Sequence, residues 1–146
     1  MSDEVRVREG RSRSLAQALE EHLTEWAERT GIAVEIWALP ARDVPPGVAR
    51  AVLAALGEAL SNVERHSGAR VVSVAVTFGR GGLRMTVSDN GIGFFGEAKG
   101  RGVAAMRTHF EQLGGSCSVN GVPGEGTTVT GVVSCQEQPG SGPQGR

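Results

Sequence analysis

The sequence predicts an α/β fold (an α+β two-layer sandwich), in which three helices cover one face of a mixed, mostly antiparallel sheet of five strands. Apolar residues recur at helical spacing in three segments and alternate at strand spacing in five others. Short turns join 71–78 to 83–88 and 116–120 to 127–134, where a doubly wound parallel sheet would have helical crossovers, so that fold is excluded. The helices must therefore lie mainly on one face of the sheet.

Residues that start or stop regular structure bound most of these elements. Ser14 is expected to cap the first helix, and Gly31 follows its last residue. His22 falls on the apolar stripe of this helix, so we expect it to face the core. Residues 79–82 supply the glycines of a tight hairpin. The expected helices are 14–30, 48–66 and 102–113, and the expected strands are 32–38, 71–78, 83–88, 116–120 and 127–134.

Length and composition indicate one globular domain. The chain has 146 residues, of which 39% are hydrophobic and 21% charged, as is ordinary for a soluble protein. A net charge of −1 argues against a nucleic-acid-binding surface, and no apolar stretch approaches the roughly 20 residues of a membrane span. We expect a cytoplasmic protein with a flexible segment at 1–13, one domain at 14–135 and a disordered tail at 136–146.

The two cysteines, Cys117 and Cys135, indicate neither a metal cage nor a disulfide. They lie on expected strands joined by a turn, and a simple hairpin register places Cys117 opposite about Thr130 rather than opposite Cys135. Free thiols are expected, as in a reducing compartment.

Glycine is the compositional outlier. The chain holds 22 glycines, and thirteen of them lie between Gly79 and Gly126. One explanation is a half of the chain that is rich in turns. The other is a backbone shaped to approach a ligand closely, because glycine leaves room there and tolerates positive φ angles.

The helix expected at 48–66 carries an ordered polar row beside its apolar face. Glu58, Asn62 and His66 follow one another at i, i+4 and i+8, and Arg65 lies close to the same line. A solvated helix face would explain this row. Oxygen ligands beside cationic groups would also suit Mg²⁺ and phosphates, because Mg²⁺ binds hard oxygens and keeps several waters.

Asp89 ends an apolar row on the strand expected at 83–88. Alternate residues of a strand share a face, so Asp89 continues the row of Leu83, Met85 and Val87 towards the helices. A carboxylate turned inward needs a hydrogen-bonding partner. The alternative is a surface turn, since Asp-Asn-Gly is ordinary turn chemistry.

Two glycine-rich segments follow Asp89. Residues 91–96 contain a formal Gly-x-Gly-x-x-Gly, but this segment does not open directly into a helix, so it is not a dinucleotide fingerprint. Gly100-Arg101-Gly102 does open a helix, where backbone N–H groups and the helix dipole favour an anion. Thr127 lies later, in one row with Val129 and Val133, and would turn its hydroxyl inward.

Four segments, in this order, resemble the motifs of the Bergerat ATPase superfamily, which includes histidine kinases, gyrase and mismatch-repair ATPases. Residues 58–66, Glu-Ala-Leu-Ser-Asn-Val-Glu-Arg-His, resemble its N box, and residues 89–94, Asp-Asn-Gly-Ile-Gly-Phe, its adenine-binding glycine box. Residues 100–107 resemble the second glycine box, and residues 124–127 the terminal Gly-x-Gly-Thr. The Gly-x-Gly-x-x-x-Met-Arg pattern at 100–107 is most similar to sensor kinases that pair with helix-turn-helix response regulators.

The resemblance implies a role for each matched residue. Asn62 would hold Mg²⁺ at the phosphates of ATP, with Glu58 beside it to orient or deprotonate the attacking group and as a second candidate ligand of the metal. Asp89 would accept a hydrogen bond from the adenine amino group. The remaining assignments place Arg65 and His66 near the phosphates, Gly91 and Gly93 against the base, Gly100, Arg101 and Gly102 at the phosphate end of a lid over 95–101, and Thr127 in support of Asp89.

The function implied is that of the ATP-binding catalytic domain of a two-component sensor histidine kinase. Such a domain transfers the γ-phosphate to a histidine on a separate dimerisation domain, which then serves a response regulator. His22 is not expected to be the acceptor, because Leu23 follows it where the family has an acidic residue. Two alternatives are a stand-alone serine kinase of the anti-sigma-factor type and an ATP-binding interaction module with little turnover.

Overall fold

The computed structural model describes residues 14–94 and 100–134, without the side chains of His66 and Ser67. The expected flexible segment 1–13, most of the expected lid, Cys135 and the expected tail 136–146 lie outside the described residues.

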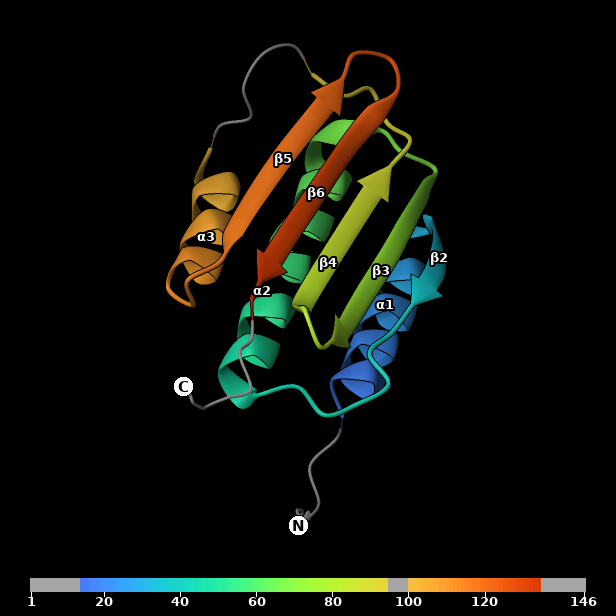
Figure 1. Cartoon of the computed structure of the whole chain (residues 1–146). Helices are drawn as coiled ribbons and strands as arrows, with labels where there is room; N and C mark the ends of the chain where they lie inside the picture. The colour runs from blue at the N-terminus through green and yellow to red at the C-terminus, as the bar shows by residue number, and fades with distance from the viewer. Residues whose placement is uncertain (1–13, 95–99, 135–146) are drawn as a thin grey trace, which may run out of the picture.

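Three helices lie on one face of a five-stranded sheet, and the opposite face is left open by the described elements (Figure 1). This arrangement confirms the two-layer fold. In chain order the elements are α1 (Leu15–Thr30), β2 (Ala33–Ala38), α2 (Pro46–Asn62), the π-helix η1 (Val63–Ser67), β3 (Val71–Gly79), β4 (Gly82–Asp89), α3 (Arg101–Glu111), β5 (Ser116–Val122) and β6 (Gly126–Val133).

The sheet is mixed and mostly antiparallel, in the order β2-β3-β4-β6-β5. The β2–β3 pair is parallel, and the other three pairs are antiparallel. Gly79 pairs with Gly82, so β3 and β4 are joined by the tight turn expected from the glycines. The inward rows of the central strands, with Val72, Val74, Val76, Leu83, Met85 and Val87, are buried under the helices.

Helix α1 begins and ends where local signals predict. The Ser14 hydroxyl accepts a hydrogen bond from the Gln17 backbone N–H at 3.1 Å, and the Gln17 side chain accepts one from the Ser14 N–H at 3.0 Å. This reciprocal pair is a capping box. Gly31 closes the other end through its N–H, which donates to the Ala27 carbonyl.

The expectation that His22 faces the core is wrong. The buried stripe of α1 consists of Leu15, Leu19, Leu23 and Trp26, whereas His22 is exposed. Each helical position turns by about 100°, so His22 lies on the solvent flank of a narrow stripe centred on Leu19 and Leu23. The aliphatic and indole side chains fill the space under the sheet without it.

The expected helix at 48–66 is α-helical only as far as Asn62. Its first residue, Pro46, suits a helix start because the missing N–H is not needed there. From Val63 to Ser67 the chain forms a π-helix, and Gly68 then ends it in the left-handed region, at φ 66°. The i+8 spacing of Glu58 and His66 therefore does not describe one continuous α-helical row.

Cys117 pairs with Gly131 rather than with Thr130, one residue from the expected register. Val122 pairs with Gly126, so the turn between β5 and β6 consists of the three residues 123–125. This turn length sets the observed register. Cys117 is buried and is a free thiol, and burial raises its pKa.

Candidate functional site

The end of α2 and the start of α3 meet at a glycine. A Cβ atom added to Gly102 would lie 3.0 Å from Oε1 of Glu58 and 3.4 Å from Oδ1 of Asn62. Both side chains are half-buried. The structure therefore brings together the N box residues Glu58 and Asn62 and the second glycine box, which are about forty residues apart in the chain.

The start of α3 faces this pair with backbone groups. Gly100 is the N-cap of the helix and has no side chain to cap the first-turn N–H groups. Those N–H groups and the positive end of the helix dipole favour a bound anion. Arg101 is exposed and adds positive charge at the same end. The α2–α3 contact thus brings the start of α3 close to the carboxylate and amide oxygens of α2.

Arg65 lies three residues after Asn62, within the π-helix. Its Nη2 atom donates a long hydrogen bond, 3.4 Å, to Oδ1 of Asn62. The guanidinium itself is exposed to solvent. The side chain of His66 lies outside the described residues.

Asp89 lies at the end of β4, half-buried as its place in the apolar row predicts. Its Oδ1 atom accepts a hydrogen bond from the Gly91 N–H at 2.8 Å. Burial raises the pKa of the carboxyl group, and the backbone N–H groups of Gly91 and Thr127 offset part of that rise. Thr127 pairs with Asp89 across β6 and β4, so these two matched residues lie side by side.

Two glycines let the backbone around Asp89 pack too closely for any side chain. Gly93 has φ 68°, and a Cβ there would overlap the Val122 carbonyl. Gly126 has φ 113°, and a Cβ there would overlap the Asp89 carbonyl. Only glycine tolerates both the φ angle and the approach. The glycine box is thereby held against the β5–β6 turn, where the Gly124 N–H also donates to the Ile92 carbonyl at 2.7 Å.

Asn90 shapes the site through its side chain, a role that the sequence did not indicate. Its side-chain oxygen accepts hydrogen bonds from the backbone N–H groups of Arg70 at 2.9 Å and Val71 at 3.1 Å. This ties the start of the glycine box to the start of β3. Asparagine beside the family's aspartate is ordinary turn chemistry, so no local signal separates this role from a turn.

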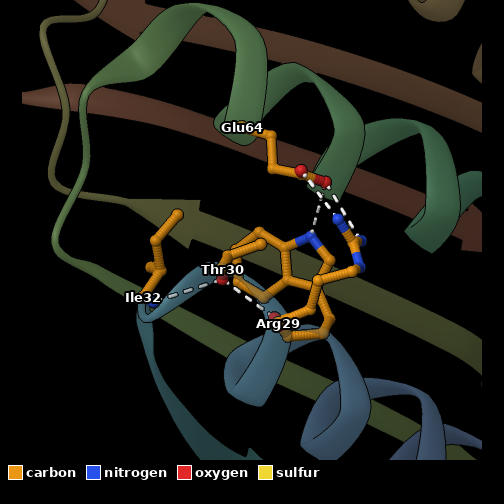
Figure 2. A network of polar contacts seen from close by, with 5 residues as sticks. Arg29, Thr30, Ile32 and Glu64 are labelled. Atoms are coloured by element: carbon orange, nitrogen blue, oxygen red, sulfur yellow. Dashed lines mark hydrogen bonds and ion pairs between the residues drawn. The ribbon is translucent and has the colours of Figure 1, made fainter.

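The sequence also provided no indication of a polar cluster that joins α1 to the π-helix (Figure 2). Glu64 accepts hydrogen bonds from Trp26 Nε1 at 3.1 Å and from two nitrogens of Arg29 at 3.0 and 3.2 Å. The donors lie on α1, 38 and 35 residues earlier. Contacts between such distant positions leave no periodic signal in one sequence.

Among the described residues, no group of three or more His, Cys, Asp or Glu side chains could hold a metal ion. No helix in the described ranges is long and apolar enough to cross a membrane.

The fold and these residues define the class of protein: an ATP-binding catalytic domain of the histidine kinase type. The sequence model of the family described as "Histidine kinase-, DNA gyrase B-, and HSP90-like ATPase" matches residues 47–137. The chain therefore belongs to this family.

Curated relatives are sensor kinases. The chain is 35% identical over 140 residues to Sensor histidine kinase MctS of Rhizobium johnstonii, a match that covers 91% of this chain and 30% of the relative. It is 33% identical over 120 residues to Sensor histidine kinase LiaS of Bacillus subtilis, covering 80% of this chain and 33% of the relative. The chain thus spans about a third of the length of these relatives.

Solved structures agree in fold. The histidine kinase domain of a blue-light activated histidine kinase from Erythrobacter litoralis has a TM-score of 0.71 at 25% identity, covering 83% of this chain and 61% of that one. The ATP-binding domain of PrrB from Mycobacterium tuberculosis has a TM-score of 0.62, covering 86% and 96%. At 20% identity, the second comparison concerns the fold alone.

Proposed function

We propose that this domain binds ATP with Mg²⁺ and transfers the γ-phosphate to a histidine on a separate helical dimerisation domain, from which a response regulator takes it. The observation that carries the proposal is the meeting of Glu58, Asn62 and Gly102 at the α2–α3 contact. It combines carboxylate and amide oxygens with helix N–H groups, which are the partners that a metal-bound phosphate needs.

The residues of α2 suit the phosphate end of the nucleotide. Asn62 would hold Mg²⁺ through Oδ1, and Glu58 is the second candidate ligand of the metal and the group that would orient or deprotonate the attacking nucleophile. One or two side-chain ligands fit Mg²⁺, which usually keeps waters and binds substrate phosphates. A bound Mg²⁺ would neutralise charge that develops on the phosphates.

The cationic and backbone groups around this pair would bind the phosphate oxygens. Arg65, released from Asn62 by the metal, would turn to the phosphates, and His66 follows it in the same π-turn. Gly100, Arg101 and Gly102 would contribute N–H groups and charge from the start of α3. These donors would act mainly by positioning, since phosphoryl transfer depends on alignment and charge stabilisation.

The other end of the site suits adenine. Asp89 would accept a hydrogen bond from the adenine amino group, with Gly91 and Gly93 near the base and Thr127 supporting the carboxylate. The space that the missing side chain of Gly93 leaves is taken by the β5–β6 turn, so Gly93 would shape the site by holding the loop against that turn. The half-buried setting of Asp89 supports this, because a carboxylate is desolvated there and gains from a donor. ATP use and transfer to a response regulator would place the reaction in the cytoplasm.

Phosphotransfer between separate domains tests the function. The purified chain is incubated with γ-labelled ATP, Mg²⁺ and a histidine-bearing helical domain taken from a sensor histidine kinase relative. We expect acid-labile label on the added domain, and none when its histidine is replaced by alanine. Acid-stable label on a serine of an added anti-anti-sigma partner would instead identify the serine kinase, and ATP binding without transfer to either would identify an interaction module.

A further inference from the structure

The transition from α- to π-helix occurs directly after Asn62. The wider turn covers Val63–Ser67, and π-helical turns of this kind are rare and concentrate at functional sites. Arg65 lies within this π-helix, and its guanidinium reaches back to Asn62, the last residue of α2. Contacts that hold the π-helix in place can therefore affect the position of Asn62 and Arg65, at the phosphate end of the proposed site.

Glu64 ties the π-helix to α1 by side-chain hydrogen bonds. Its two carboxylate oxygens accept three hydrogen bonds, one from Trp26 and two from Arg29, all from α1. Figure 2 shows the Glu64 side chain reaching from the π-turn to the end of α1. Arg29 and Trp26 lower the pKa of Glu64, as expected for a carboxylate bound by charged and N–H donors.

The exposed fractions of the three side chains indicate whether this cluster mainly positions the π-helix or mainly stabilises the fold. Trp26 is only 3% exposed, so its indole position is imposed by the core. The side chains of Arg29 and Glu64 are 63% and 33% exposed, and ion pairs with that access to water contribute little to folding stability. The cluster therefore fixes the geometry of the turn more than it stabilises the fold.

We propose that Glu64 is a positioning residue of the nucleotide site, which fastens the π-turn to α1 through Trp26 and Arg29 and so holds Asn62 and Arg65 in place for Mg²⁺ and phosphate. The proposal rests on the proposed function. It also makes α1 part of the site's support, although no residue of α1 belongs to the four matched motifs.

Calorimetric titration of ATP with and without Mg²⁺ tests it. The measured quantity is the Mg²⁺-dependent tightening, the ratio of the two dissociation constants. We expect Glu64→Ala to reduce this ratio by roughly three- to thirtyfold while the Mg²⁺-free affinity, set largely by adenine and Asp89, stays within about twofold. Glu64→Gln keeps an oxygen for Trp26 and should restore part of the ratio.

Two further variants distinguish a local effect on the site from a folding defect. Arg29→Gln changes an exposed side chain, leaves Glu64 and Trp26 intact, and should lower the ratio in the same direction. Glu28→Ala, at an exposed glutamate of the same helix, is the control and should match the unmodified protein. Thermal unfolding of each variant checks that the fold is kept.

The outcomes separate this proposal from the proposed function. An unmodified chain that fails to bind ATP with Mg²⁺ overturns both. An unmodified chain that binds, with unchanged ratios in Glu64→Ala and Arg29→Gln, overturns the positioning role alone. An equal loss of affinity with and without Mg²⁺ in Glu64→Ala also overturns it, because it would indicate general loosening of the domain.

Discussion

The Oδ1 atom of Asp89 lies 2.8 Å from the backbone nitrogen of Gly91, whose N–H donates to it. This bond holds the carboxylate at the end of β4, half-buried and beside Thr127 of β6. The relationship matters for nucleotide recognition, because a fixed and partly desolvated acceptor discriminates between bases that present a donor and bases that do not.

We expect ATP to bind at least about tenfold more tightly than GTP. Adenine presents an amino donor where guanine presents a carbonyl, and a hydrogen bond to a charged group contributes roughly 1.5–3 kcal/mol, with 1.4 kcal/mol per tenfold change in affinity. Asp89→Asn should remove most of this preference. Calorimetric titration with both nucleotides measures it, and equal affinities would sink the adenine assignment.

Asp89 should cost stability when no nucleotide is bound. Burial raises its folded pKa above the ordinary value of about 3.9. A raised carboxyl pKa stabilises the fold below the ordinary value and loses that contribution as pH rises through the folded pKa. We therefore expect the thermal stability of Asp89→Asn, measured relative to the unmodified chain without nucleotide, to increase as the pH rises from 4 to 7. A difference that is constant or shrinks over this range would contradict the prediction.

Asn62 and Glu58 should separate metal binding from transfer. Asn62→Ala is expected to remove most of the Mg²⁺-dependent tightening of ATP binding, since Asn62 would be the main ligand. Glu58→Gln should leave ATP binding within a few-fold and lower the rate of transfer, as expected of a group that acts mainly in the transition state. Titration and a transfer assay together measure this. Lost binding in Glu58→Gln, with normal transfer per bound ATP, would reverse the two roles.

Gly102 and Gly57 form a matched pair of helical glycines. A Cβ at Gly102 would meet Glu58 at 3.0 Å, whereas nothing lies within 4 Å of a Cβ at Gly57. Gly57→Ala should stabilise the domain by about 0.5–1 kcal/mol and leave ATP binding unchanged. Gly102→Ala should keep the fold, because only a flexible side-chain end must move, but weaken Mg²⁺–ATP binding. Chemical denaturation and titration distinguish them, and equal nucleotide affinity in both variants would count against the α2–α3 site.

The isolated chain should not label itself with acid-labile phosphate. His22 is exposed on α1, but α2 lies between α1 and α3 in the helix layer (Figure 1). Transfer needs the nucleophile and the phosphate held together, which can supply many kcal/mol of the barrier. Incubation with γ-labelled ATP and Mg²⁺ checks this, with His22→Ala as the control. Strong label that disappears in His22→Ala would identify His22 as the acceptor.

The sequence by itself determined the features that depend on neighbours within a few residues. The capping box of Ser14 and Gln17, the Gly31 end of α1 and the Gly79–Gly82 hairpin all follow from short-range hydrogen bonds and backbone freedom. The inward row of β4, ending at Asp89, follows from strand alternation. Motif order then indicated the candidate site residues, although it left their arrangement in space open.

Tertiary packing decided what local rules leave open. His22 is exposed because the core needs only a narrow stripe of α1. The π-turn after Asn62 and its bonds from Trp26 and Arg29 join positions 35 and 38 residues apart. The approach of Gly102 to Glu58 likewise exists only once α3 packs beside α2. Helical spacing constrains one element at a time, whereas these contacts depend on how two elements pack, and that depends on the whole core.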